Sequence, residues 1–149
     1  YGLHLNSSSA EVDDYGFFAD IAPNATTFQV GYDGTTGSVD RLYLAMLFAS
    51  VDGISKVGYY EGTGSSQEIV TGFSPRFLII KKTSGSAYWI VLDTTRGWGS
   101  GNDKWMQLND GAAQGDFNWG YPGPTGFVIS TNATEANGNG EKYIYYAHA

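Results

Sequence analysis

The chain has no cysteine, which excludes a disulfide framework and any cysteine nucleophile. It is also poor in positive charge: eight Lys and Arg stand against 15 Asp and Glu, for a formal net charge of −7. Electrostatic binding to nucleic acid or to an anionic membrane requires a positively charged surface. The longest apolar run, Leu42–Ser50, is far shorter than the ~20 residues of a membrane span. We therefore expect neither nucleic-acid binding nor membrane insertion.

Glycine and aromatic residues are abundant, with 21 Gly, 11 Tyr and 8 Phe among 149 residues. This composition is typical of short strands joined by tight turns and not of helices. The length suits a single domain, 1–149, that is large enough to bury a core. The chain starts at Tyr1 without a methionine and ends in a strand-like run, as expected of a segment cut or processed from a longer protein or of an artificial boundary.

The most informative stretch is Pro75–Thr94, which predicts a β-hairpin. Two runs rich in aliphatic and aromatic residues, Arg76–Lys82 and Ala87–Asp93, flank the polar tetrad 83–86, whose glycine can supply a positive φ. Both runs are apolar on both faces, which indicates strands covered on both sides. We expect an all-β fold: a two-sheet antiparallel, jelly-roll-like sandwich with the hairpin 75–94 near its centre.

Further strands are expected on either side of this hairpin. In the N-terminal third they are Tyr1–Asn6, Asp14–Asp20, Thr27–Tyr32 and Asp40–Ala49. After it they are Ser55–Glu61, Glu68–Thr71, Lys104–Asn109, Thr125–Ser130 and Lys142–Ala149. Residues 95–123 otherwise form a loop-rich region.

The two ends of the chain resemble each other, which indicates an internal repeat. Leu5-Asn6 matches Leu108-Asn109, Thr27–Val30 matches Gly126–Ile129, and Tyr43–Ala49 matches Tyr143–Ala149 with Ala45 opposite Tyr145. On this interpretation residues 1–49 are the second half of a unit and residues 50–149 are a whole one. Half a unit cannot close a core alone. It either completes the sandwich of 50–149, which we favour here, or pairs with another chain; chance similarity of composition is the alternative to repetition.

The run 58–97 resembles a recurrent module of large structural proteins in tailed phages, and the match extends to residue 149. The family pattern has a Y-x-G-x-G turn, a G-F-x-P strand entry, an apolar strand ending in Lys, a W-x-x-x-D-T-x-R-G strand end, and closing L-N, G-F and Y-x-x-Y-x-x-A segments. The matching residues are Tyr60, Gly62, Gly64, Gly72, Phe73, Pro75, Lys81, Trp89, Asp93, Arg96, Gly97, Leu108, Asn109, Gly126, Phe127, Tyr143, Tyr146 and Ala149. The end Ala-His-Ala departs from the commoner Trp- or Lys-containing end. The resemblance implies a concanavalin-like sandwich in tail fibres, appendages or other virion surface proteins, without an established catalytic centre.

The candidate ligand-binding residues lie at strand ends and in glycine-rich loops. Asp93 and Arg96, in the motif D-T-T-R-G, could contact a sugar or a partner at the sheet rim, or could simply pair to close a turn. Trp98, Trp119 and Tyr121 could stack on sugar rings, or could plug the end of the sandwich or an oligomer interface. These five residues form the candidate glycan site.

Patterns for metal-dependent or hydrolytic chemistry are absent from the sequence. The Asp- and Asn-rich loops offer oxygen ligands but lack EF-hand spacing, so they are either solvated turns, which we favour, or a calcium site assembled from different loops. The residues concerned are Asp33, Asp52, Asn102, Asp103, Asp110, Asp116, Asn132, Asn137 and Asn139. His4 and His148 show no zinc-ligand spacing, and there is no G-x-S-x-G elbow. The E-x-D-x-E strand of a glycosidase is also missing. We expect no catalytic residues, no enzyme activity and no required cofactor.

The predicted function is a non-enzymatic structural domain of a phage virion surface, in a tail fibre or appendage and thus extracellular, which could also bind host glycans. Its partners would be other virion proteins and further copies of itself, with a trimer as a plausible assembly. Two alternatives stay open: a capsid decoration or cement protein, and a secreted carbohydrate-binding module.

Overall fold

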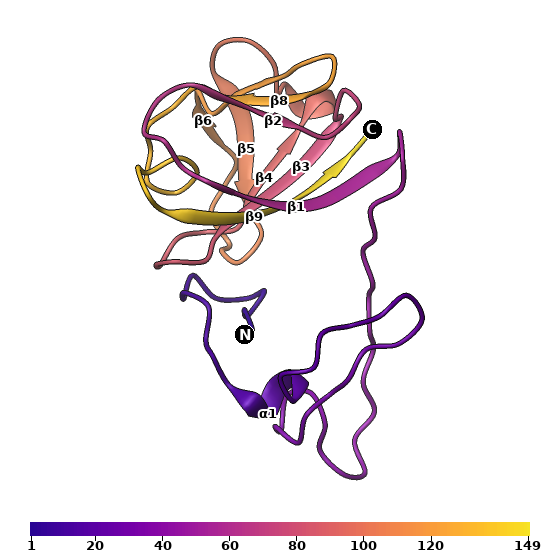
Figure 1. Ribbon diagram of the computed structural model, residues 1–149. Coiled ribbons are helices and arrows are strands. Elements are labelled where there is room, and N and C mark those ends of the chain that lie inside the picture. The colour runs from indigo at the N-terminus through magenta and orange to yellow at the C-terminus, as the bar shows by residue number, and fades with distance from the viewer.

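The computed structural model describes all residues, 1–149, and contains two antiparallel β-sheets (Figure 1). One sheet has six strands in the order β1-β9-β3-β4-β5-β6, and the other has three in the order β2-β8-β7. The strands are β1 Ser55–Glu61, β2 Gln67–Val70, β3 Phe77–Lys82, β4 Ile90–Asp93, β5 Asp103–Gln107, β6 Gly115–Phe117, β7 Gly120–Pro122, β8 Gly126–Ile129 and β9 Lys142–His148. The all-β, two-sheet antiparallel fold predicted from the sequence is confirmed; the jelly-roll connectivity stays a prediction.

The expected hairpin lies in the middle of the six-stranded sheet. β3 and β4 pair antiparallel from Phe77↔Asp93 to Ile80↔Ile90, with β9 on one side and β5 on the other. β4 starts at Ile90, three residues later than predicted, because the amide N–H of Ala87 donates to the carbonyl of Ser8 outside the sheet. The N–H of Trp89 likewise donates to the side chain of Asn109.

The core lies between the sheets and is formed by side chains from both of them. Leu78, Ile80, Ile90 and Leu92 of the hairpin are fully buried there. Tyr60, Tyr143 and Tyr145 pack with Phe127 of the opposite sheet, and the Tyr60 and Tyr143 rings stack with centroids 5.0 Å apart. Burial removes these side chains from water, which is the main force holding the two sheets together.

The N-terminal third was predicted wrongly as four strands. Residues 1–54 contain no strand and lie outside the two sheets, as the indigo and purple part of Figure 1 shows. They include one short helix, α1 Tyr15–Phe18, whose first turn is capped by the Asp14 side chain accepting from the N–H of Gly16 at 2.7 Å. Residues 1–49 therefore do not add strands to the sandwich of this chain.

The region predicted as loop-rich contains two strands that the sequence pattern missed. β6 and β7 are three residues each and lie between glycines and polar residues, so neither shows a recognisable alternation. No helix in the structure is long and apolar enough to cross a membrane.

Candidate functional site

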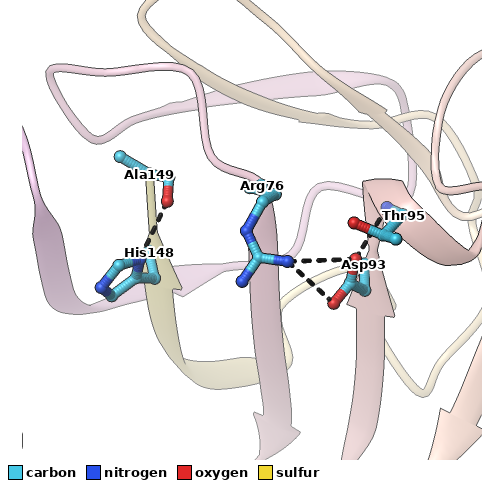
Figure 2. Close-up of polar contacts among 5 residues, drawn as sticks. All are labelled: Arg76, Asp93, Thr95, His148 and Ala149. Atoms are coloured by element: carbon cyan, nitrogen blue, oxygen red, sulfur yellow. Dashed lines mark hydrogen bonds and ion pairs between the residues drawn. The ribbon is translucent and has the colours of Figure 1, made fainter.

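Asp93 lies at the end of β4 and makes two structural contacts (Figure 2). Its carboxylate accepts a hydrogen bond from the N–H of Thr95 at 2.7 Å, which caps the 3-10 helix η1, Thr94–Arg96. It also pairs with the guanidinium of Arg76 on the neighbouring strand end at 3.3 Å. The predicted Asp93–Arg96 pair is therefore replaced by an Asp93–Arg76 pair, which the sequence did not indicate because Arg76 is 17 residues away.

Arg96 points to a different neighbour. Its guanidinium lies 3.5 Å from the side-chain carbonyl of Gln114, at the limit of a hydrogen bond, and the residue is exposed. The chain then turns at Gly97, whose φ of 110° favours glycine. The D-T-T-R-G motif thus forms a capped turn, and Thr95 and Arg96 are its exposed side chains.

The two tryptophans of the predicted glycan site belong to the core. Trp98 is 3% exposed and Trp119 is 4% exposed, and both pack in the main hydrophobic cluster. The indole N–H of Trp98 donates to the carbonyl of Gly120 at 3.1 Å, whereas that of Trp119 is buried without a partner. Neither ring presents a face on which a sugar could stack, so the prediction of Trp98 and Trp119 as sugar contacts is corrected.

A buried carboxylate fixes the loops around these rings. Asp103, at the start of β5, accepts hydrogen bonds from the N–H groups of Gly99, Trp119 and Gly120 at 3.0, 2.9 and 3.2 Å. Burial raises the pKa of Asp103, and the three N–H donors act against that shift. No motif in the sequence marks Asp103 for this role.

Tyr121 is the one aromatic residue of the predicted glycan site that is exposed. It lies on β7, in the three-stranded sheet, whereas Asp93 ends a strand of the other sheet. The structure joins Trp98 and Trp119 through the core, but records no contact among Tyr121, Asp93 and Arg96. The five residues predicted to bind glycans therefore do not come together in a single binding site.

The most distinctive surface is an apolar groove on the face of the six-stranded sheet that points away from the core. We call it the outer-face groove; its volume is about 730 Å³, and eleven of its twelve lining residues are hydrophobic. The lining residues are Leu5, Met46, Phe48, Val57, Gly58, Tyr59, Ile79, Trp89, Leu108, Ile144, Tyr145 and Tyr146. A groove of this composition recognises shape and apolar surface, with few polar groups to orient a ligand.

The first residues of the chain form one wall of this groove. They dock onto the β3–β4 connection through the indole N–H of Trp89, which donates to the carbonyl of His4 at 3.1 Å. The buried ammonium of Lys81 donates to the carbonyls of Ser8 and Ala87 at 3.2 and 3.0 Å. Burial also lowers the pKa of Lys81. The far wall comes from Phe48, whose ring lies 4.9 Å from that of Tyr146.

Two acidic side chains in the loops bond to the backbone of their own turns. Asp33 and Asp110 each accept from the N–H two residues later, at 2.7 and 2.8 Å, as is usual for turns. No group of three or more His, Asp or Glu side chains is placed to hold a metal ion.

A family model described as "Domain of unknown function (DUF7483)" matches residues 1–149. The chain belongs to this family. No curated protein and no solved structure matches it.

Sequence reasoning missed the outer-face groove because it expected both faces of β3 and β4 to be covered. The available signal was the alternation in Lys56–Tyr60 and Tyr143–Ala147, which places Val57, Tyr59 and Ile144 together on one face.

Proposed function

We propose that this DUF7483 chain is a non-enzymatic structural domain of a phage virion surface, in a tail fibre or appendage. The observation that carries the proposal is the outer-face groove, a large apolar surface without convergent polar groups. Contiguous apolar residues on an exposed surface are a common feature of sites of protein association. The resemblance of residues 58–149 to phage structural modules favours a virion as the assembly in which the domain takes part.

The residues of the phage-like pattern support the same role, because they build the fold. Asp93 caps η1, Lys81 anchors the N-terminal residues, and Tyr143 closes the loop before β9. Gly62 approaches the backbone so closely that an added Cβ would collide with the carbonyl oxygen of Gly138. The residues of the pattern therefore stabilise the fold, as expected of a structural module.

Assembly is favoured over glycan recognition because the predicted stacking platform is missing. Trp98 and Trp119 are in the core, and Tyr121 and Arg96 belong to different sheets or loops. A pyranose site needs an aromatic face with polar groups beside it.

Mass spectrometry of purified phage particles tests the proposal. Peptides from residues 55–149 are expected at the copy number of a structural component, and antibodies to the domain are expected to label the tail in electron micrographs. Labelling of the capsid would assign the domain to decoration instead. Absence from purified particles, together with specific binding on a glycan array, would overturn the virion role in favour of a secreted carbohydrate-binding module.

A further inference from the structure

The loop that precedes β9 has a characteristic closure. The hydroxyl of Tyr143 accepts from the N–H of Gly138 at 2.8 Å and donates to the carbonyl of Thr134 at 2.7 Å. Near its end the backbone takes a positive φ of 73° at Gly140. These contacts fold the loop back on the first residues of β9 and so set the position at which that strand starts.

The same closure occurs 100 residues earlier, in the part of the chain that has no strands. The hydroxyl of Tyr43 accepts from the N–H of Ser38 at 3.0 Å and donates to the carbonyl of Gly34 at 3.1 Å. The backbone again takes a positive φ, of 60°, at Asp40. A positive φ is uncommon outside glycine, so its recurrence at the matching position is informative.

The two loops also contain the same hydrogen-bonded turn. The carbonyl of Ala133 accepts from the N–H groups three and four residues later, at 3.0 and 2.7 Å. The carbonyl of Asp33 does the same, at 3.0 and 2.8 Å. Two loops 100 residues apart therefore share a turn, a tyrosine closure and a positive φ, although few of their side chains are identical.

The segments after these two loops differ completely. β9 lies between β1 and β3 and is paired along both edges. Its inward side chains, Tyr143, Tyr145 and Ala147, are buried. The matching run 43–49 has no strand partner, and its apolar residues are exposed: 89% for Leu44 and 76% for Leu47.

We propose that residues 43–48 form the central strand of a second sandwich, and that they pair with the first half of another copy of the repeat unit that residues 50–149 form. The partner is a polypeptide with the pattern of residues 55–97, which supplies one strand of the β1 type and one of the β3 type. This inference does not depend on the virion role: it holds or fails whatever the assembled protein does.

The pairing pattern of β9 argues for this partner and against a simple apolar one. An apolar surface would cover Leu44 and Leu47 but would leave the backbone N–H and C=O groups of 43–48 without hydrogen bonds, which is costly in a buried strand. Two flanking strands satisfy both edges. The inward positions also fit a core of similar volume, because Ala45 replaces Tyr145 while Leu47 replaces Ala147.

A duplication within the chain tests the pairing. A second copy of residues 50–103 is placed directly before Tyr1, since Tyr1 matches position 104 in the repeat, and hydrogen exchange is followed by mass spectrometry. Amides of 43–48 are expected to exchange at least about 100-fold more slowly than in the original chain, as in a cooperatively folded strand. Unchanged exchange in these residues, with the added copy unfolded or paired to residues 108–149, would overturn the proposal.

Two point variants make the result specific. In the extended chain L47D is expected to abolish the new protection, because it places a carboxylate in the second core; in the original chain it is expected to leave the melting temperature unchanged. The matched control is V39D, at a residue 86% exposed in the preceding loop, which is expected to keep the protection.

If the extended chain aggregates, a segment replacement in the original chain tests whether residues 43–49 can form the same strand as β9. Residues 143–149 of the original chain are exchanged for the sequence of 43–49, YLAMLFA. Cooperative unfolding with protected amides in the new strand supports the equivalence of the two segments. Loss of the folded state, under conditions where the original chain is folded, contradicts it.

Discussion

At the scale of single residues, Asp103 holds together the loops around two core tryptophans. We predict that D103N lowers the free energy of unfolding by about 1–3 kcal/mol. The substitution removes a buried charge, but its amide group places a donor against the N–H donors of Gly99 or of Trp119 and Gly120. Urea unfolding followed by tryptophan fluorescence measures the loss.

The control for Asp103 is D116N. Asp116 forms an exposed ion pair with Lys104 on the same pair of strands, β5 and β6. Exposed pairs contribute little, so a change below about 0.5 kcal/mol is expected. Equal effects of D103N and D116N would mean that the three N–H bonds to Asp103 do not stabilise the loops.

Tyr143 is predicted to make stability depend on alkaline pH. Its buried hydroxyl bonds to Gly138 and Thr134, and Y143F is expected to cost about 1–3 kcal/mol at pH 7. Burial raises the pKa of Tyr143 to about 12, from 10.0 for an ordinary tyrosine. The unfolded chain therefore releases this proton first, and the hydroxyl's contribution is complete below pH 10 and lost as the pH rises from 10 to 12.

The difference between the original chain and Y143F isolates this effect from other groups that titrate in the same range, including Lys81. The free-energy difference measured by urea unfolding at pH 8, 10 and 11.5 should shrink only above pH 10. A difference that stays constant to pH 11.5 would contradict the raised pKa.

At the scale of elements, the N-terminal residues are predicted to depend on Lys81 for docking. K81M keeps an unbranched side chain that is one atom shorter, but removes the donors to Ser8 and Ala87. The N–H of Glu11, which donates to the carbonyl of Thr83, should then exchange about 10-fold faster, because docking becomes a local opening.

Amides of β9 serve as the internal reference for that measurement, since this strand is paired on both edges. K104M removes an exposed lysine on β5 and should change neither rate. If K81M accelerated β9 as much as Glu11, Lys81 would be stabilising the whole sandwich and not the docked segment.

Elements with both local pattern and available partners could be predicted from the sequence. β1 was predicted with its observed bounds, and β3, β8 and β9 within one or two residues, because apolar residues there alternate between turn signals. Residues 27–30 and 43–49 carry the same pattern as β8 and β9, yet they form no strand. Strands are stabilised mainly by their neighbours, and this chain offers those segments none.

The candidate site was harder to predict for a similar reason. Glycine-rich surroundings suggested exposed rings at Trp98 and Trp119, but the loops fold inward around Asp103 and bury them. The Asp93–Arg76 pair depends on strand register, which no local motif encodes. The outer-face groove is formed by strands and by the N-terminal residues together, so it follows only from their packing.

At the scale of the whole molecule, the outer-face groove is predicted to drive association between copies of the chain. Tyr59 is 86% exposed on β1 and lines the groove. Covering such a side chain contributes about 1.5–3 kcal/mol, so Y59S should weaken self-association by about 10–100-fold. Sedimentation velocity over a range of protein concentrations measures the change.

Two comparisons separate this association from the strand pairing of residues 43–48. V70S removes an exposed valine on β2, which lies in the other sheet and outside the groove, and should leave sedimentation unchanged. Met46 and Phe48 line the groove, whereas Leu47 does not. L47D should therefore preserve self-association while preventing strand formation in the extended chain. Y59S should weaken self-association while leaving strand formation in the extended chain intact. If L47D dispersed the oligomers as Y59S does, the exposed run 43–48 and the groove would be one contact surface, and the second sandwich would not be needed to explain why the run is apolar.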